Sequence, residues 1–185
     1  RDVNRICQRH TTWGFSATLH KKDYEEHYRD GPKPRKIPLD TMYGCCFRMC
    51  LSFAIDMAEK VAEWKDPQIR FVLEKGHRHA GDAERVFNQV KKGVPELHRV
   101  LAGIEFIEKG AAFGVQGADA VAYAANMQER EGGLDLADFR PGVDIVAARK
   151  TVRAKSPIFR LEGNPRILAE MRNNLLTLEE RRRQW

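Results

Sequence analysis

Two carboxylates, Glu74 and Asp119, stand at positions where α/β proteins commonly bind ligands. Glu74 follows the short apolar run at 69–73, and Asp119 lies near the start of the small-residue segment at 114–128. No lysine or arginine lies within 114–128 to pair with Asp119. A buried charge without a partner is costly, so Asp119 is expected either to cap a helix or to hold a ligand.

A strand-end glutamate and a helix-start aspartate together would form a hard oxygen site. Strand ends and helix starts are the usual ligand positions of open α/β folds, and carboxylate oxygens suit Mg²⁺ or Mn²⁺. Such ions can activate water and stabilise the leaving oxygen in phosphodiester cleavage. We therefore predict that Glu74 and Asp119 are metal ligands and catalytic residues. The alternative is structural, with Glu74 as a solvent-facing strand terminus and Asp119 as a helix cap or dipole partner.

Two histidines follow Glu74 closely, in the sequence EKGHRH at 74–79. His77 could carry a proton to the leaving group or join Glu74 in a metal site. The alternative is that His77 and His79 are exposed loop residues beside Arg78. Signatures of zinc proteases, serine hydrolases, P-loop nucleotide hydrolases and dehydrogenases are absent from the sequence, which disfavours those classes. A small-molecule hydrolase using Glu74 and His77 would require a closed pocket.

The chain is basic, with a formal net charge of +6 and a pI near 9.3. A segment at 146–161 carries several cations and no acid, and a second basic loop covers 33–36. Such runs can neutralise phosphates without reading sequence, although many are only solvated surfaces. The predicted nucleic-acid contacts are Arg149, Lys150, Arg153 and Lys155.

The hydrophobic pattern predicts strands alternating with helices, and hence a mixed α/β layer fold in one domain over 1–185. Asp40 is expected to cap a long helix, and Asn164 followed by Pro165 is expected to begin the last one. The expected strands cover 13–19, 69–75 and 100–109, and the apolar run at 69–75 is interpreted as a central strand buried on both faces. The expected helices cover 41–63, a segment from Gly81, a segment from about Gln116, and the C-terminal stretch. The expected apolar stripe of the first helix is Tyr43, Phe47, Cys50, Leu51, Ala54, Ala58 and Val61, and that of the last is Leu168, Met171, Leu175 and Leu178.

Compartment and membrane association can also be judged from the sequence. No apolar run approaches the roughly 20 residues that a membrane span needs, so no membrane contact is expected. The first ten residues lack the apolar core of a signal peptide. Cys7, Cys45, Cys46 and Cys50 do not show zinc-ligand spacing, and we interpret them as reduced packing residues of a cytoplasmic protein.

The run FVLEKG, the helix and strand after it, and the Gln-x-Ala-Asp segment at 116–119 resemble the domain of unknown function 3800 family, whose members are RNase H-like. The resemblance covers roughly residues 10–130. It implies an RNase H-like mixed sheet flanked by helices, with acidic residues that converge on a metal site. Glu74 and Asp119 match the second and third of these acids. The first, in an Asp-Glu-x-Gly strand, is absent, since Asp2 lies in a different context.

The missing first acid leaves two expectations open. Either the opening hairpin lies upstream of residue 1, or this chain has lost a ligand. In the first case the sequence predicts a metal-dependent nuclease of RNase H-like type that uses Mg²⁺ or Mn²⁺. In the second it predicts a non-catalytic module that binds nucleic acid or a partner protein, including a second copy of itself.

Overall fold

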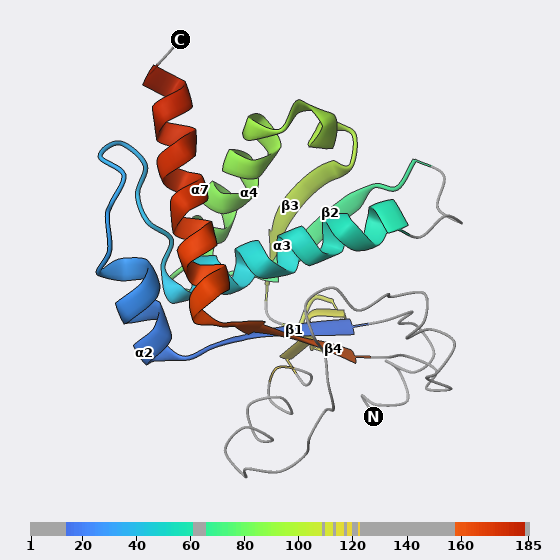
Figure 1. The fold of residues 1–185 in the computed structure, drawn as a ribbon. Helices are drawn as coiled ribbons and strands as arrows, with labels where there is room; N and C mark the ends of the chain where they lie inside the picture. The colour runs from blue at the N-terminus through green and yellow to red at the C-terminus, as the bar shows by residue number, and fades with distance from the viewer. Residues whose placement is uncertain are drawn as a thin grey trace. The chain divides into compact units, whose positions relative to one another are not determined.

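The computed structural model describes residues 14–60, 66–108, 110–112, 114–116, 118–119, 122 and 158–183, with side chains at 158–160 and 181–183 excepted. Helices and short parallel sheets alternate along the chain (Figure 1). The elements are β1 (Gly14–Leu19), α2 (Lys21–Asp23), the π-helical turn η1 (Tyr24–Arg29), α3 (Met42–Lys60), β2 (Ile69–Glu74), α4 (Ala80–Gly93), the 3-10 turn η2 (Pro95–His98), β3 (Leu101–Ile107), β4 (Ile158–Gly163) and α7 (Pro165–Arg183). This order confirms the mixed α/β class and the C-terminal helix.

Strand pairing gives two small sheets, β1 with β4 and β2 with β3. The amide of Ile69 donates to the carbonyl of Val100, and the amide of Lys75 donates to that of Ile107, both at 2.7 Å. Because both partners advance in the same direction, β2 and β3 are parallel, and α4 with η2 forms the crossover of a β-α-β unit. The strands expected at 69–75 and 100–109 are thereby confirmed.

The β2 strand packs one face and exposes the other. Ile69, Phe71 and Leu73 are partly buried, whereas Arg70 is exposed and Val72 retains 40% of its accessible surface. The sequence interpretation of a strand buried on both faces is therefore wrong for β2. A run of apolar residues such as Phe-Val-Leu does not by itself distinguish one packed face from two.

Aromatic contacts fix the packed face of β2 against α3 and α4. The ring of Phe71 lies edge-on to Phe47 of α3, with centroids 5.3 Å apart, and to Phe87 of α4 at 6.1 Å. Edge-to-face pairs of this kind add stabilisation beyond the area that they bury. Phe71 thus packs β2 against both the long helix α3 and the crossover helix α4.

The long helix α3 is buried on more than the single stripe expected from its sequence. Phe47, Leu51, Ala54 and Ala58 are buried as expected. Additional buried residues, not part of the expected stripe, are Gly44, Cys45, Ile55 and Met57. A helix packed by neighbours on several sides loses the clear amphipathic pattern on which the prediction relied.

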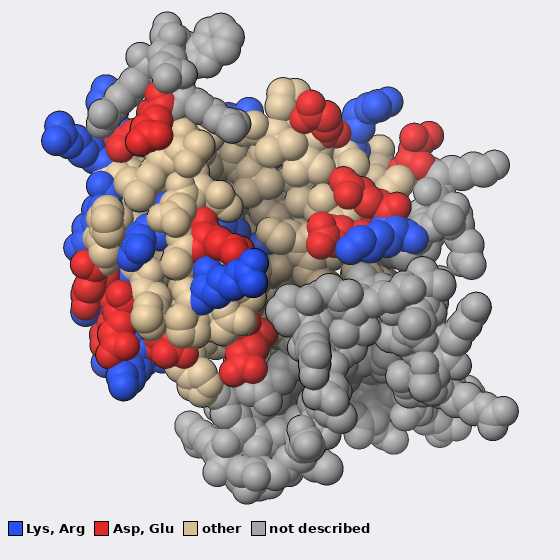
Figure 2. Space-filling view, in the orientation of Figure 1, with Lys and Arg blue, Asp and Glu red and all other residues tan. Residues whose placement is uncertain are grey.

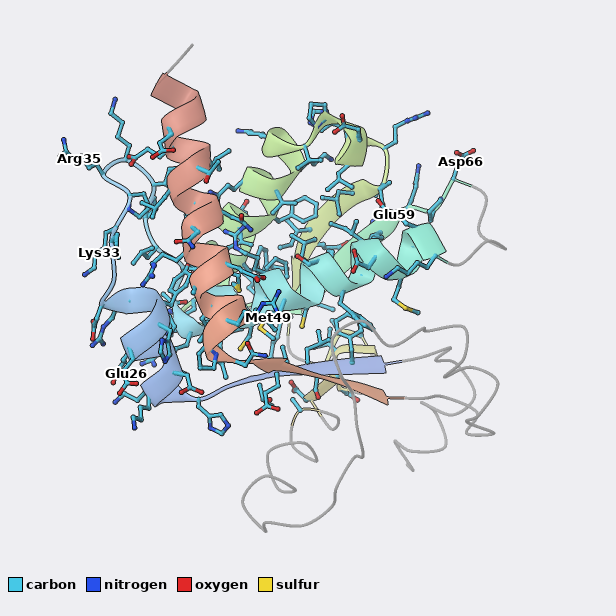
Figure 3. All side chains as sticks on the ribbon, viewed as in Figure 1. Glu26, Lys33, Arg35, Met49, Glu59 and Asp66 are labelled. Atoms are coloured by element: carbon cyan, nitrogen blue, oxygen red, sulfur yellow. The ribbon has the colours of Figure 1, made fainter. Side chains whose placement is uncertain are left out.

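The C-terminal helix α7 begins where the sequence indicated. The side-chain oxygen of Asn164 accepts the amide of Ile167 at 3.0 Å, and Pro165 occupies the first helical position. Met49 of α3 lies beside this junction, its sulfur 3.3 Å from the position of a Cβ added to Gly163 (Figure 3).

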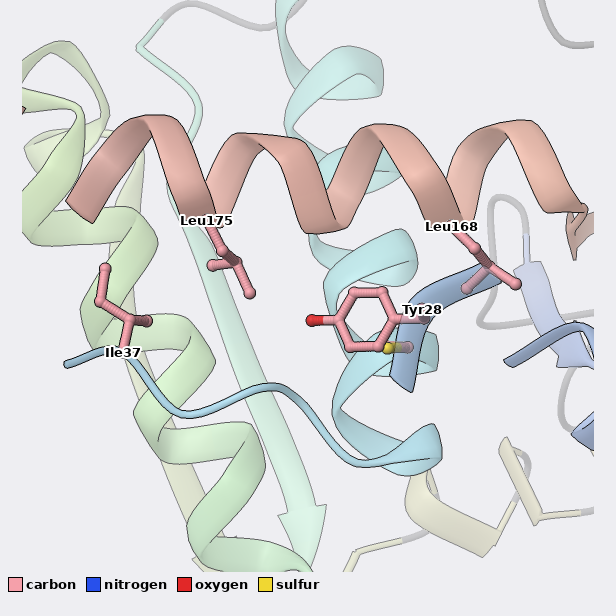
Figure 4. Close-up of a cluster of buried hydrophobic side chains, with 5 residues drawn as sticks. Tyr28, Ile37, Leu168 and Leu175 are labelled. Carbon is pink, nitrogen blue, oxygen red and sulfur yellow. The ribbon is translucent and has the colours of Figure 1, made fainter. Parts of the chain in front are cut away.

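A buried apolar cluster joins α7 to η1, α3 and the loop between them (Figure 4). Its members are Tyr28, Ile37, Cys45, Leu168 and Leu175. Met171 and Leu178 pack against it at partial burial, which confirms the predicted apolar face of the last helix.

Burial raises the pKa values of the thiols of Cys46 and Cys50, to about 11 and about 12, so both are protonated at neutral pH.

The chain forms two compact units. One comprises 1–16, 72–75 and 106–161, and the other comprises 17–71, 76–105 and 162–185. Each of the four strands within the described ranges has residues in both units, and the predicted single domain stays a prediction. None of the helices within the described ranges is both long enough and apolar enough to cross a bilayer.

We predict that Leu168→Ala lowers the free energy of unfolding by about 2–5 kcal/mol, because it removes a fully buried side chain from this cluster. Urea unfolding followed by circular dichroism measures the change. The control is Asn174→Ala on an exposed position of the same helix, for which a change within about 0.5 kcal/mol is expected. Equal losses in the two variants would contradict the assignment of Leu168 to the core.

Candidate functional site

Glu74 is the last residue of β2, at the carboxyl end of a parallel strand. Its side chain is partly buried, and the described residues offer it no hydrogen bond or ion pair. The next residue differs, because the Lys75 ammonium pairs with Glu108 beyond the end of β3 at 2.8 Å. Glu74 therefore has the position expected of a ligand-binding carboxylate at this edge.

Asp119 lies in a helical stretch of the chain after β3, where 114–116, 118–119 and 122 are helical. Its side chain is exposed, and no partner for it is found in the described part of the chain. Within the same part, no group of three or more His, Cys, Asp or Glu side chains is arranged to hold a metal. The role of Glu74 and Asp119 as a shared metal site stays a prediction.

The basic residues divide into those that the structure describes and those that it does not. Arg149, Lys150, Arg153 and Lys155 lie outside the described residues, so their predicted nucleic-acid contacts remain predictions. Lys33 and Arg35 are exposed and point outward from the loop before α3 (Figure 3). Figure 2 shows lysine and arginine interspersed with acidic side chains over the described surface in view, rather than gathered in one patch.

The backbone of the basic loop at 33–36 is hydrogen-bonded to a buried carboxylate of α7. Glu179 is 6% exposed and accepts the backbone amides of Arg35, at 2.9 Å, and of Lys36. Backbone amides bound in this way fix the loop while its cationic side chains stay in solvent.

The connection between β2 and α4 places two histidines next to a tyrosine of α3. Gly76, the second residue of this connection, has a φ of +91°, a backbone conformation that residues other than glycine rarely adopt. The ring of Tyr43 stacks on that of His77, with centroids 4.6 Å apart and planes 27° apart. The ring of His79 lies 6.3 Å from Tyr43 and 5.6 Å from His77. We call Tyr43, His77 and His79 the ring cluster.

Hydrogen bonds within the connection set the tautomers of the neutral imidazoles. The backbone amide of His79 donates to Nδ1 of His77 at 3.2 Å, so the proton of a neutral His77 ring resides on Nε2. The Nε atom of Arg78 donates to Nε2 of His79 at 2.9 Å, so the proton of a neutral His79 ring resides on Nδ1. His77 is exposed and His79 is partly buried.

A buried network of charges joins η1, α3 and α4. The Asp40 carboxylate is fully buried and binds two guanidinium groups. Arg48 of α3 approaches it through two nitrogens, at 2.7 and 3.1 Å, and Arg85 of α4 binds it at 2.7 Å. The Tyr28 hydroxyl donates to the same carboxylate at 3.1 Å. Four donors thus compensate the loss of hydration of Asp40.

A second carboxylate, Asp82 in the first turn of α4, completes the network. It accepts the amide of Thr41 at 2.9 Å and its hydroxyl at 2.6 Å, and it also pairs with Arg85. Burial opposes the charge of Asp82, but the bonds from Thr41 and Arg85 outweigh burial and lower its pKa below 3.8. The network thus contains two carboxylates, Asp40 and Asp82, and two guanidinium groups, and its net charge is zero.

The network corrects the sequence interpretation of Asp40 as the cap of the long helix. Thr41 takes that part, because its hydroxyl accepts the amide of Gly44 at 3.1 Å. The carboxylate of Asp40 turns instead toward Arg48 and Arg85. All four charged groups are engaged with one another, so the network positions α3 against α4 rather than binding a substrate.

Sequence reasoning missed the ring cluster and the charge network. Their members lie far apart in the chain, and the sequence pattern pointed only to the aspartate before the helix and to the two histidines, without their partners. Comparison of the chain with protein-family models, with curated proteins and with solved structures found no significant match. The resemblance to the domain of unknown function 3800 family therefore stays a prediction.

We predict that Asp40→Asn lowers the free energy of unfolding by about 3 kcal/mol or more, because two buried guanidinium groups lose their common counter-charge. Chemical unfolding measures this change. Asp56→Asn is the matched control, since Asp56 is exposed on α3 and its one ion pair among the described residues is with Lys60 at 3.9 Å. A loss below about 1 kcal/mol for Asp40→Asn would contradict the inferred importance of the network.

The lowered pKa of Asp82 predicts a pH-dependent contribution to stability. The contribution is complete above the ordinary aspartate pKa of 3.8 and declines as the pH falls through the lower pKa of the folded state. The difference in unfolding free energy between wild type and Asp82→Asn is therefore expected to be constant from about pH 7 to about pH 5 and to shrink below it. A difference that persists undiminished at about pH 2 would contradict this expectation.

Proposed function

We propose that this chain is a divalent-metal-dependent phosphodiester hydrolase of RNase H-like type that acts on nucleic acid. The main support is the placement of Glu74, a partly buried carboxylate without a described partner at the carboxyl end of a strand in a parallel β-α-β unit. Glutamate side chains are mostly exposed in folded proteins, so a partly buried one at a strand end is a candidate ligand.

The donor set fits the proposed metal. Glu74 and Asp119 supply carboxylate oxygens, the ligands that Mg²⁺ and Mn²⁺ prefer, and Mg²⁺ commonly keeps waters and takes only one or two carboxylates. Bound there, such an ion would activate water and stabilise the leaving oxygen of a phosphodiester. The protein residues would hold the ion and the substrate backbone, the latter through Arg149, Lys150, Arg153 and Lys155 by the sequence prediction.

His77 fits a binding role better than the predicted proton transfer. Its ring face lies against Tyr43, and its Nδ1 already accepts the amide of His79. One ring edge is therefore occupied, whereas stacking uses the faces of the ring. Glu74 and Asp119 remain the proposed catalytic pair.

We predict that Glu74→Gln and Asp119→Asn each reduce metal-dependent cleavage by about 100-fold or more, because each removes a ligand charge. The measurement is the cutting rate of single-stranded, duplex and hybrid substrates with Mg²⁺ or Mn²⁺. Glu96→Gln, an exposed carboxylate on η2, is the matched control and is expected to cut as the wild type does.

Cleavage by the Glu74 and Asp119 variants at the wild-type rate would remove both residues from the mechanism. Binding of nucleic acid by the wild type without cutting under any of these conditions would contradict the hydrolase and favour the non-catalytic module.

A further inference from the structure

The ring cluster takes no part in the proposed metal chemistry, and we infer that it is a binding site for one unpaired base of a single-stranded nucleic acid. The inference depends on the proposed function for the class of substrate. It adds how one base of that substrate would be bound at His77, which follows Glu74 by three residues in the chain.

The first support is the geometry of the rings. Tyr43 and His77 already form a stack, with centroids 4.6 Å apart and planes only 27° from parallel. Proteins that bind single strands stack bases on aromatic side chains in this manner, and the interaction tolerates any base because every base has a π-face. A base laid on His77 would extend the existing stack by one ring.

The second support is the difference in solvent exposure between the rings of Tyr43 and His77. Tyr43 is partly buried near the start of the 19-residue helix α3, whereas His77 is exposed. The inner ring is therefore anchored and the outer one is open to a ligand. The bond from the amide of His79 to Nδ1 of His77 holds the outer ring in place before any ligand arrives. Order of this kind reduces the entropy that binding must cost.

The third support is the cation at the centre of the connection. Arg78 is exposed, and its Nε atom is bound to His79 at 2.9 Å. No bond from its terminal nitrogens is found within the described ranges, so they can donate to the phosphate attached to a stacked base. Proteins that bind single-stranded nucleic acid commonly combine aromatic side chains, which stack on bases, with cations, which contact the phosphates.

The single-stranded state follows from the same geometry. A base inside a duplex has both faces covered by its neighbours and cannot present one to His77. A base in a single strand is free to do so.

The test is binding in the presence of EDTA, so that no metal-dependent cleavage contributes. Fluorescence anisotropy measures the affinity of the full chain for labelled thymidine and uridine oligomers and for an abasic oligomer with the same number of phosphates. We expect at least one base-bearing strand to bind more tightly than the abasic strand. His77→Ala and Tyr43→Leu are expected to weaken that binding by about 5- to 150-fold.

Two controls separate stacking from folding and from charge. Tyr43→Phe retains the ring and is expected to bind as the wild type does. His98→Ala removes an exposed histidine of η2, which lies just before the amino end of β3. This variant is also expected to leave binding unchanged. Thermal unfolding of each variant shows whether Tyr43→Leu still folds, and His77→Ala, at an exposed position, carries the test if it does not.

Equal binding of base-bearing and abasic strands would overturn the inference, as would base-dependent binding that His77→Ala leaves intact. The absence of any binding would overturn it as well. Base-dependent binding at His77 without metal-dependent cutting would uphold the inference and reject the proposed hydrolase. Cutting that depends on Glu74 without base-dependent binding would do the reverse.

Discussion

The buried carboxylate of Asp40 is the group on which the positions of the surrounding elements depend. Removing a charge from water costs several kcal/mol, and here the cost is offset only because Arg48, Arg85 and Tyr28 all reach the same two oxygens. These three side chains come from α3, α4 and η1. The packing of those elements is therefore specified by electrostatics as well as by apolar contact, since a shift of any one would leave a buried charge incompletely bonded.

The same constraint reaches the candidate site through the chain. Asp82 ties the first turn of α4 to Thr41 at the start of α3, so the end of the β2–α4 connection is fixed. At its other end this connection follows Glu74, whose strand is paired with β3. His77 and Arg78, which are proposed to contact the substrate, thus lie on a short exposed segment held at both ends, a common arrangement for binding loops on rigid scaffolds.

Local signals in the sequence predicted much of this fold, and long-range signals were missing. The cap at Asn164 and the strands at 69–75 and 100–109 were predicted because their patterns are complete within a few residues. Asp40 was interpreted as a cap because its local pattern is that of one, while its partner Arg85 lies on another helix. The β4 strand was not predicted, since it carries charged residues and pairs with β1 from the opposite end of the described chain.

The candidate site follows the same division. Glu74 could be placed at a strand end from sequence alone, whereas the stack of Tyr43 on His77 requires α3 to lie against the β2–α4 connection, which no periodicity encodes.

Gly44 sets a constraint on how this sequence can diverge. A Cβ at this position would overlap the Oδ2 atom of Asp82 and would lie 3.1 Å from the Cβ of Asp40. The missing side chain therefore provides the space into which the carboxylate of a neighbouring helix fits. In related chains a larger residue at position 44 would be compatible only with a shorter one at 82, so the two positions are expected to covary. That covariation would be a signature by which distant relatives could be identified even where their surface residues have no similarity.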